Sequence, residues 1–266
     1  MTRPMLAALF LLPFLGAPWI SPHDPLTQYR DHAGSPPGCG DPCFLLGSDE
    51  FGRDVLSRLL HGGRLSLIAG LTASLVALTL GGLLGGLAGY FGNWLDSLLS
   101  PPMDLLFALP WLYLLLAARA ALPLSLPSAT ALLVLMSLIG LAGAAAPFRL
   151  CRHVVRSARQ SGPVSAAAGL GASDWYLLRA HLWPAALPAL GTQALSLFPA
   201  FVLAEVSLSF LGLGAGDPAV SWGSILASLR QYPVLTSQWW MFSPALALAL
   251  LLALLPAPRL GWKEIP

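Results

Sequence analysis

Residues 66–95 have the sequence SLIAGLTASLVALTLGGLLGGLAGYFGNWL, which contains no Asp, Glu, Lys or Arg. A transmembrane helix needs about 20 consecutive, predominantly apolar residues, so this stretch is long enough to cross a bilayer. Other stretches without these charged residues lie at 4–22, 120–148, 181–204 and 231–258. The chain is therefore predicted to cross a membrane several times.

Composition supports the same class for the whole chain. The 266 residues are 56% hydrophobic and 10% charged, and their mean hydropathy is +0.71. A soluble domain carries about 25% charged residues. We therefore predict an all-α, polytopic integral membrane protein. The net charge of +2 is too small to indicate nucleic-acid binding.

We expect about six transmembrane helices, separated by loops that carry most of the charged residues. The third reaches its full length only if Arg119 extends its side chain to the membrane interface. The predicted spans lie near residues 4–20, 66–92, 103–121, 127–147, 188–211 and 239–257.

The placement of arginine predicts the orientation. Arg149, Arg152, Arg156 and Arg159 cluster between two predicted spans, and short cytoplasmic loops carry an excess of Lys and Arg. We therefore expect residues 149–184 to be cytoplasmic, together with both termini.

The first span has a competing interpretation as a secretory signal peptide. No Ala-x-Ala cleavage site precedes Ser21, which favours an uncleaved anchor. Cys39 and Cys43 follow in a loop that this topology places outside, where a disulfide is permitted. Only His32 is near them, and a zinc site wants four ligands, so we expect no metal there.

Residues 165–184, SAAAGLGASDWYLLRAHLWP, interrupt the apolar pattern with small and polar residues. Their order is small residues, a glycine, a short amphipathic run and a proline. That order suits a compact helix–turn–helix docked on a partner better than a solvated tether.

This stretch resembles the cytoplasmic "EAA" loop of ABC-importer permeases. The resemblance rests on Ala166 and Ala167, then Gly171, then Pro184 thirteen positions later, with Ser165 where the family usually has Glu. It implies that residues 165–176 are a coupling helix in a cleft of an ATPase subunit, with a sharp turn at Gly171. The residues assigned to this coupling loop are Ser165, Ala166, Ala167, Gly171, Ala172, Ser173, Asp174 and Pro184.

Residues 46–64, LGSDEFGRDVLSRLLHGGR, predict an amphipathic helix lying flat at the outer membrane surface before the second span. Ser48 is a suitable cap for this helix, and Asp54 and Arg58 have the i, i+4 spacing of an ion pair. The residues assigned to this outer segment are Gly47, Asp49, Gly52, Arg53, Asp54 and Arg58.

The outer segment is similar to the one that opens the core domain of dipeptide/oligopeptide/nickel importer permeases. A further match is AEVSLSFLGLG at residues 204–214, followed by SWG at 221–223. The resemblance implies an ABC-importer type I permease core at residues 46–266, with its coupling loop near 149–184. Residues 1–45 would be an N-terminal anchor helix and an extracytoplasmic loop.

The resemblance also implies a division of labour. The expected partners are a homologous second permease, P-loop ATPase subunits that bind ATP and Mg, and an extracytoplasmic substrate-binding protein. The only lysine is Lys263 and no P-loop motif is present, so we expect no enzyme activity and no cofactor in this chain. The expected location is a bacterial-type plasma membrane. The expected cargo is a small solute, by default a di- or oligopeptide, with nickel, opines and glutathione-like compounds as family alternatives.

Glu205 is the only acid well inside a predicted span. Acids there are costly and mark a functional group or a buried partner. Two interpretations stay open: Glu205, with Ser209, lines the translocation path or its gate, or it is a hydrogen-bonded structural acid. An ion-coupled secondary transporter would favour several such acids, and a non-transporting scaffold would need none.

Five glycines form overlapping small-xxx-small patterns in the second span, which allow close helix packing. Packing within this subunit is the favoured interpretation, and contact with the second permease is the alternative. These residues are Gly81, Gly82, Gly85, Gly86 and Gly89.

Overall fold

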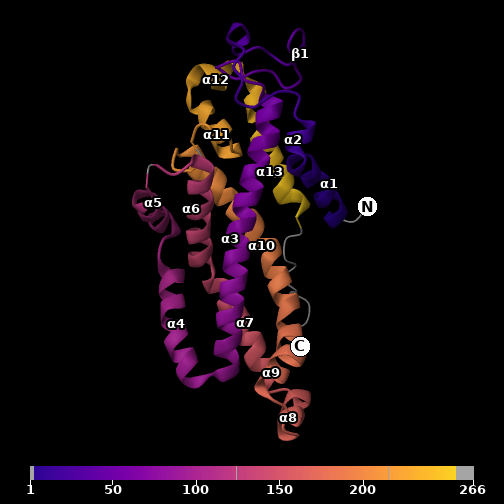
Figure 1. Ribbon diagram of the computed structural model, residues 1–266, viewed down its shortest axis with the longest axis vertical. Helices are drawn as coiled ribbons and strands as arrows, with labels where there is room; N and C mark the ends of the chain where they lie inside the picture. Colours follow the sequence, from indigo (N-terminus) through magenta and orange to yellow (C-terminus); the bar gives the residue numbers. More distant parts are fainter. Residues whose placement is uncertain (1–2, 124, 215, 256–266) are drawn as a thin grey trace. The chain divides into compact units, whose positions relative to one another are not determined.

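A computed structural model describes residues 3–123, 125–214 and 216–255 (Figure 1). Helices dominate this part of the chain, and its two strands, β1 (Gly38–Cys39) and β2 (Cys43–Phe44), pair antiparallel. The α-helices are α1 (Arg3–Leu15), α2 (Ala17–Ile20), α3 (Val55–Phe91), α4 (Asn93–Ala108), α5 (Trp111–Ala121), α6 (Ser128–Gly143), α7 (Ala145–Arg159), α8 (Gly162–Gly169), α9 (Asp174–Leu177), α10 (Trp183–Phe210), α11 (Trp222–Ala227), α12 (Tyr232–Ser237) and α13 (Ser243–Leu254). Shorter helical turns are η1 (Arg30–His32), η2 (Leu178–Leu182), η3 (Ser228–Arg230) and η4 (Trp239–Phe242).

The chain forms two compact units, and α3, α6 and α10 each contribute to both. The first unit comprises Met1–Leu71, Leu122–Val134 and Pro199–Pro256. The second comprises Thr72–Ala121 and Leu135–Phe198, and its remaining part, Ala257–Pro266, lies outside the described residues, as do Arg259 and Lys263.

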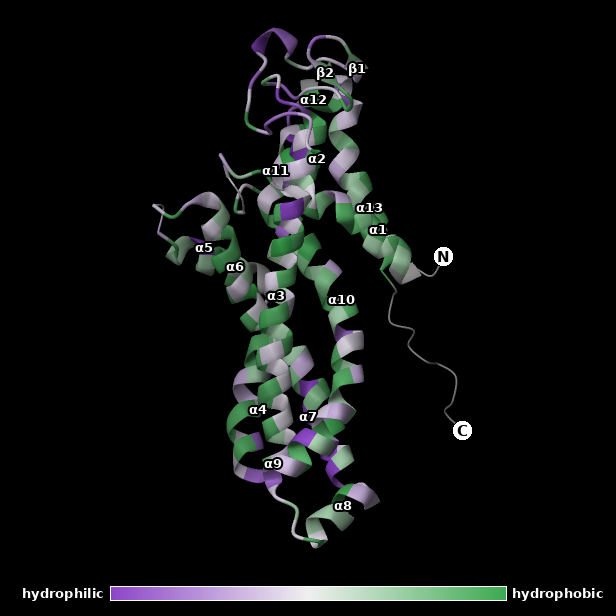
Figure 2. Cartoon of the chain, turned by 45° about the vertical axis from the view of Figure 1, so that its right-hand side comes forward, coloured by the Kyte–Doolittle hydropathy of each residue, from purple (hydrophilic) through white to green (hydrophobic). Residues whose placement is uncertain are grey.

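The membrane class and the all-α fold are confirmed, whereas the helix count is approximate. Two helical stretches, Val55–Phe91 and Asp174–Phe210, are long and apolar enough to cross a bilayer in the described part of the chain. A third candidate is the pair α6 and α7, which is bent by 40°. Figure 2 shows hydrophobic residues along most of α3, α6 and α10. The apolar helices Met5–Leu15 and Trp239–Leu254 are shorter and lie at the predicted first and last spans.

The predicted span near 103–121 is not one continuous helix. It is divided between α4 and α5, with Leu109 extended at the break. Pro110 follows Leu109, and the residue before a proline is disfavoured in the helical conformation. The predicted span is therefore interrupted by Pro110 and not by the charge of Arg119.

In the first unit, the expected flat helix at residues 46–64 is wrong. Residues 46–54 form a loop, and α3 begins at Val55 and continues unbroken to Phe91. Asp54 caps this helix, because its Oδ2 accepts the Ser57 backbone N–H at 3.0 Å and the Ser57 hydroxyl. Ser48 is not the cap; its hydroxyl accepts the Ser35 N–H at 2.9 Å.

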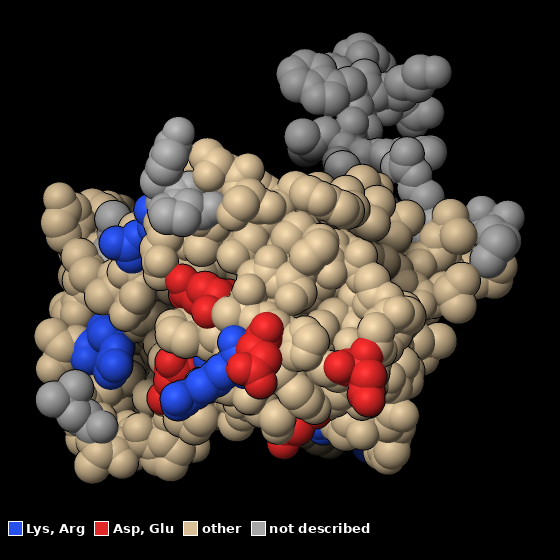
Figure 3. All heavy atoms as spheres, turned by 90° about the horizontal axis from the view of Figure 1, so that it is seen from above, with Lys and Arg blue, Asp and Glu red and all other residues tan. Residues whose placement is uncertain are grey.

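Asp49 organises the loop that precedes α3. Its carboxylate accepts the backbone N–H groups of Phe51 and Arg53 at 2.9 and 2.8 Å, and the Arg53 guanidinium at 2.6 Å. Arg58, predicted to pair with Asp54, instead has its Nε 3.5 Å from Asp49. Asp49, Asp54 and Arg58 are all buried, so this charge pattern holds a fold together and does not mark a solvated helix face. Figure 3 shows acidic and basic side chains adjoining on the face seen from above.

Two glycines of the predicted outer segment lie in this loop with positive φ angles, +70° at Gly47 and +77° at Gly52. At Gly52, a Cβ atom would lie 2.0 Å from the carbonyl oxygen of Tyr29. Nearby, a disulfide joins Cys39 and Cys43 across the β1–β2 pair.

In the second unit, the glycines of α3 allow α7 to pack directly against it. A Cβ at Gly81, Gly85 or Gly89 would lie 2.3, 2.3 or 2.6 Å from a backbone carbonyl oxygen of α7 or of Ala144, which precedes it. Those distances leave no room for a methyl group. The glycine pattern therefore serves packing within this subunit, as favoured from the sequence.

Ion pairs join α4 to α7. Asp104 accepts Arg149 at 2.7 Å, and Asp96 accepts Arg152 at 2.7 Å and lies 3.6 Å from Arg156. Hydrogen bonds from Ser100 and Arg152 hold the pKa of the Asp96 carboxyl below its usual value. The arginine cluster is thus partly neutralised within the chain.

We predict that Gly85→Ala destabilises the second unit by about 1–3 kcal/mol, because the added methyl group meets the Phe148 backbone. Gly82→Ala is the matched control, since its Cβ would meet only the flexible Leu190 side chain at 3.2 Å. Thermal unfolding of both variants in the same detergent measures the difference. Equal unfolding temperatures would contradict the tight contact between Gly85 and the α7 backbone.

Candidate functional site

Residues 160–182, here called the turn segment, form the predicted helix–turn–helix. Its first helix, α8, ends at Gly169, and the chain reverses at Gly171, whose φ is +86°. Ser173 caps α9, because its hydroxyl accepts the Tyr176 N–H at 3.3 Å. The coupling helix expected at 165–176, with its turn at Gly171, is divided between two helices: Ser165, Ala166 and Ala167 lie on α8, and Asp174 begins α9. Ala172 lies in the turn between the two helices.

Pro184 lies in the first turn of α10, immediately after the π-helical η2. Proline has no N–H to donate to the carbonyl four residues earlier, so the regular α-helical hydrogen bonding is interrupted there. Widening to a π turn is a recognised way to accommodate such an interruption. The helix from Asp174 to Phe210 stays continuous through it.

Hydrogen bonds join the turn segment and the end of α7 to α3. The Tyr90 hydroxyl donates to Asp174, and Arg159 donates to the Tyr90 carbonyl oxygen. The Arg159 guanidinium also lies 4.9 Å from the centroid of the Tyr90 ring, within cation–π range. Tyr90 is buried in an apolar cluster with Cys151, Val155, Val164, Leu177, Leu178, Leu182 and Ala186.

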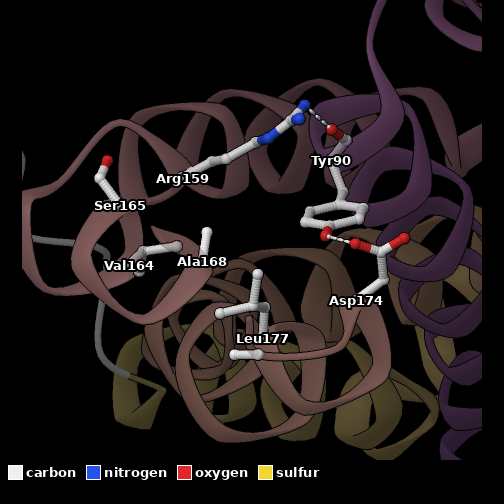
Figure 4. A pocket seen from close by; sticks show the side chains of 8 residues that line it. Tyr90, Arg159, Val164, Ser165, Ala168, Asp174 and Leu177 are labelled. Atoms are coloured by element: carbon white, nitrogen blue, oxygen red, sulfur yellow. Dashed lines mark hydrogen bonds between the residues drawn. The ribbon is translucent and has the colours of Figure 1, made fainter. Parts of the chain in front are cut away.

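A cavity of about 440 Å³ opens beside this junction (Figure 4). Figure 4 shows Arg159, Tyr90 and Asp174 on one side of the opening and the apolar side chains of Val164, Ala168 and Leu177 below it. The lining residues are Tyr90, Arg159, Val164, Ser165, Ala168, Ala172, Asp174 and Leu177.

The outer surface of the turn segment carries large apolar side chains. Leu170 is 89% exposed, Trp175 69% and Tyr176 54%. They lie at and just after the turn, whereas the neighbouring Leu177 is buried. The segment thus has an inward face that anchors it and an outward apolar face.

A second polar site surrounds Glu205, which is completely buried in the first unit. The Ser209 hydroxyl donates to Glu205 Oε1 at 2.7 Å, and the hydroxyls of Ser66 and Ser221 also interact with this carboxyl group. Glu205 Oε2 has no hydrogen-bond partner within the described residues. The structure therefore supports the hydrogen-bonded acid, and a role on the translocation path stays a prediction.

The Glu205 site brings distant sequence motifs together. Ser66 on α3 accepts the Trp222 backbone N–H at 3.1 Å, and the Trp222 indole donates to the Leu59 carbonyl oxygen at 3.1 Å. A Cβ at Gly223 would lie 2.3 Å from the Val206 carbonyl oxygen. The matched motifs at 204–214 and 221–223 therefore meet each other and α3 in one packed cluster.

Some residues of both sites were not anticipated from the sequence. From the sequence, Tyr90 counts among the apolar residues of a span, Ser66 carries no distinguishing pattern, and Ser221 stands in the matched motif at 221–223 without an assigned contact. A hydroxyl inside an apolar span, where few polar partners exist, was the available signal for Tyr90 and Ser66.

Comparison with known proteins identifies the family. The family described as "Binding-protein-dependent transport system inner membrane component" matches residues 59–257.

The chain belongs to this family.

The chain aligns over most of its length with named permease proteins. It is 38% identical over 240 residues to the di/tripeptide transport system permease protein DppC of Pseudomonas aeruginosa, with 89% of this chain and 77% of the relative covered. It is 34% identical over 241 residues to the probable D,D-dipeptide transport system permease protein DdpC of Escherichia coli, covering 90% and 76%. It is 33% identical over 251 residues to the dipeptide transport system permease protein DppC of Bacillus subtilis, covering 92% and 75%.

A solved structure has the same fold. It is the crystal structure of an amino acid ABC transporter with histidines, with a TM-score of 0.51 and 15% sequence identity, covering 75% of this permease and 90% of that chain. The resemblance to ABC-importer permeases is therefore confirmed. The family therefore replaces the two alternatives considered from the sequence, an ion-coupled secondary transporter and a non-transporting scaffold.

We predict that Glu205→Ala destabilises the permease by about 2–5 kcal/mol, since it opens a cavity and removes the acceptor of buried hydroxyls. Glu205→Gln keeps the side-chain volume and one acceptor oxygen, so it should cost less. Ser207→Ala is the control on the same helix, because the Ser207 hydroxyl makes an exposed hydrogen bond to the Leu203 carbonyl oxygen at 2.8 Å. Thermal unfolding in detergent ranks the variants, and a Glu205→Ala protein as stable as Ser207→Ala contradicts the structural role.

Proposed function

We propose that this permease forms half of the translocation pathway of an ATP-driven importer and that the turn segment docks on an ATPase subunit. The carrying observation is the outward exposure of Leu170, Trp175 and Tyr176. Exposed clusters of large apolar side chains mark interaction surfaces, and aromatic residues are enriched among interface hot spots.

The contacts behind the turn segment suit it to transmit motion. Asp174 begins the helix that continues as α10, and Tyr90 lies near the end of α3. The Tyr90–Asp174 hydrogen bond connects α3 to the segment, and the Arg159–Tyr90 hydrogen bond connects α3 to the end of α7, directly before the segment. A displacement of the segment would therefore reach both helices, and nucleotide state in the ATPase would bias the permease between inward- and outward-open conformations.

The proposed assembly contains a homologous second permease, P-loop ATPase subunits and an extracytoplasmic binding protein. ATP and Mg would be bound by the ATPase subunits. The turn segment and both termini would be cytoplasmic, because the arginines of α7 precede the segment.

The proposed cargo is a short peptide. Support comes from the names of the relatives, which are di/tripeptide, D,D-dipeptide and dipeptide permeases. Nickel, opines and glutathione-like compounds remain the alternatives to be tested in uptake assays.

Purification from the native membrane in mild detergent tests the assembly. Stoichiometric mass spectrometry should find a homologous permease and P-loop ATPase subunits with this chain. Recovery of the chain alone, or only as a homo-oligomer, would contradict the proposal.

Gly171→Asp should uncouple ATP hydrolysis from uptake while the membrane helices stay folded. A non-glycine residue at a φ of +86° costs about 1–2 kcal/mol, so the turn should rearrange. Gly169→Asp is the matched control, because it adds the same charge at the end of α8 without a positive φ. Peptide uptake and ATPase activity are measured on complexes of equal yield. Normal peptide uptake by the Gly171→Asp complex would contradict the proposed coupling role of this turn.

A further inference from the structure

The cavity beside Tyr90 holds two opposite charges that do not neutralise each other. Arg159 and Asp174 both line it, yet among the described residues no ion pair within 4.0 Å involves either of them. Arg159 donates one N–H to the Tyr90 carbonyl oxygen, and the Asp174 carboxylate accepts a hydrogen bond from the Tyr90 hydroxyl. Both side chains are exposed, so their remaining hydrogen-bonding groups are accessible to a ligand.

Tyr90 sets the spacing of the two charges. Arg159 is bonded at the backbone end of this tyrosine and Asp174 at its hydroxyl end. The two charged groups thus meet opposite ends of one tyrosine and lie more than 4.0 Å apart. An extended dipeptide separates its terminal charges by the length of two residues, roughly 7 Å.

The volume and the remaining wall fit a small amphipathic ligand. The cavity measures about 440 Å³, and small-molecule sites occupy about 300–1,000 Å³. Val164, Ala168 and Leu177 supply an apolar wall next to the charged residues (Figure 4).

We propose that this cavity binds a short zwitterionic peptide. Its carboxylate pairs with Arg159, its ammonium group pairs with Asp174, and an apolar side chain lies along the wall formed by Ala168 and Leu177. The inference rests on the proposed function, in which the turn segment is cytoplasmic and the cargo is a peptide. The site then samples the delivered product. A peptide that bridges Arg159 and Asp174 stiffens the turn segment and slows further cycles, which gives feedback from product to transport.

Binding is tested on the assembled complex in lipid nanodiscs, without the binding protein, by calorimetric titration with alanyl-leucine. Saturable binding is expected. N-acetyl-alanyl-leucine and alanyl-leucine amide, which each lack one charge, should bind at least tenfold more weakly. Arg159→Gln should weaken alanyl-leucine but leave the amide unchanged, because the amide has no carboxylate for Arg159 to bind.

A steric pair of variants locates the binding. Ala168→Leu fills the cavity and should abolish binding, whereas Gly162→Leu, on the same helix but outside the lining, should not. Absence of saturable binding, equal affinity for the blocked peptides, or full binding by Ala168→Leu would overturn the inference.

Peptide uptake by the complete system, with its binding protein, separates this inference from the proposed function. Uptake without binding at the cavity overturns the feedback site alone. Absence of uptake overturns the proposed cargo, whatever the titration shows.

Discussion

The contact of α3 with α7 is the constraint on which the second unit depends. Gly81, Gly85 and Gly89 recur every four residues, so they lie on one face of α3 and bring it against the α7 backbone. Within a bilayer, the hydrophobic effect does not drive helices together, and close backbone approach of this kind supplies the packing energy. The same contact fixes α7, whose last residue is Arg159, and thereby sets where the turn segment starts.

Buried polar groups then specify which segments meet. In the first unit, Glu205 gathers hydroxyls from α3, α10 and the cap of α11. In the second, Tyr90 connects α3 to Asp174 and Arg159. A polar group left unpaired in an apolar interior costs several kcal/mol, so each arrangement penalises alternative packings. Apolar packing stabilises the contacts between helices, and these buried polar groups determine which helices pair.

Much of this organisation was predictable from the sequence, and the failures have physical causes. Long uncharged stretches predicted the membrane class, and Gly171 predicted the reversal at which its φ is positive. The amphipathic pattern at 46–64 misled, because Asp49, Asp54 and Arg58 are all buried and Arg58 approaches Asp49 of the preceding loop instead of Asp54.

Hydrophobic periodicity predicts the side of a helix on which a residue lies, but it does not predict which residue of another helix will contact it. For that reason the Tyr90–Asp174 contact, which joins residues 84 positions apart, could not be anticipated. Pro110 was an available local signal, but the apolar composition of the surrounding stretch outweighed it in the prediction.

The outward face of the turn segment also has a consequence for the life of the subunit before assembly. Leu170, Trp175 and Tyr176 are exposed only until something covers them. A copy made in excess of its partners keeps this apolar patch in contact with water, and such patches attract aggregation, chaperones and proteases. In the assembly proposed above, the ATPase subunit covers the patch and removes this risk. Under that proposal, the turn segment ties the abundance of the chain to the supply of its partners, so synthesis in fixed proportion is favoured without a separate regulator.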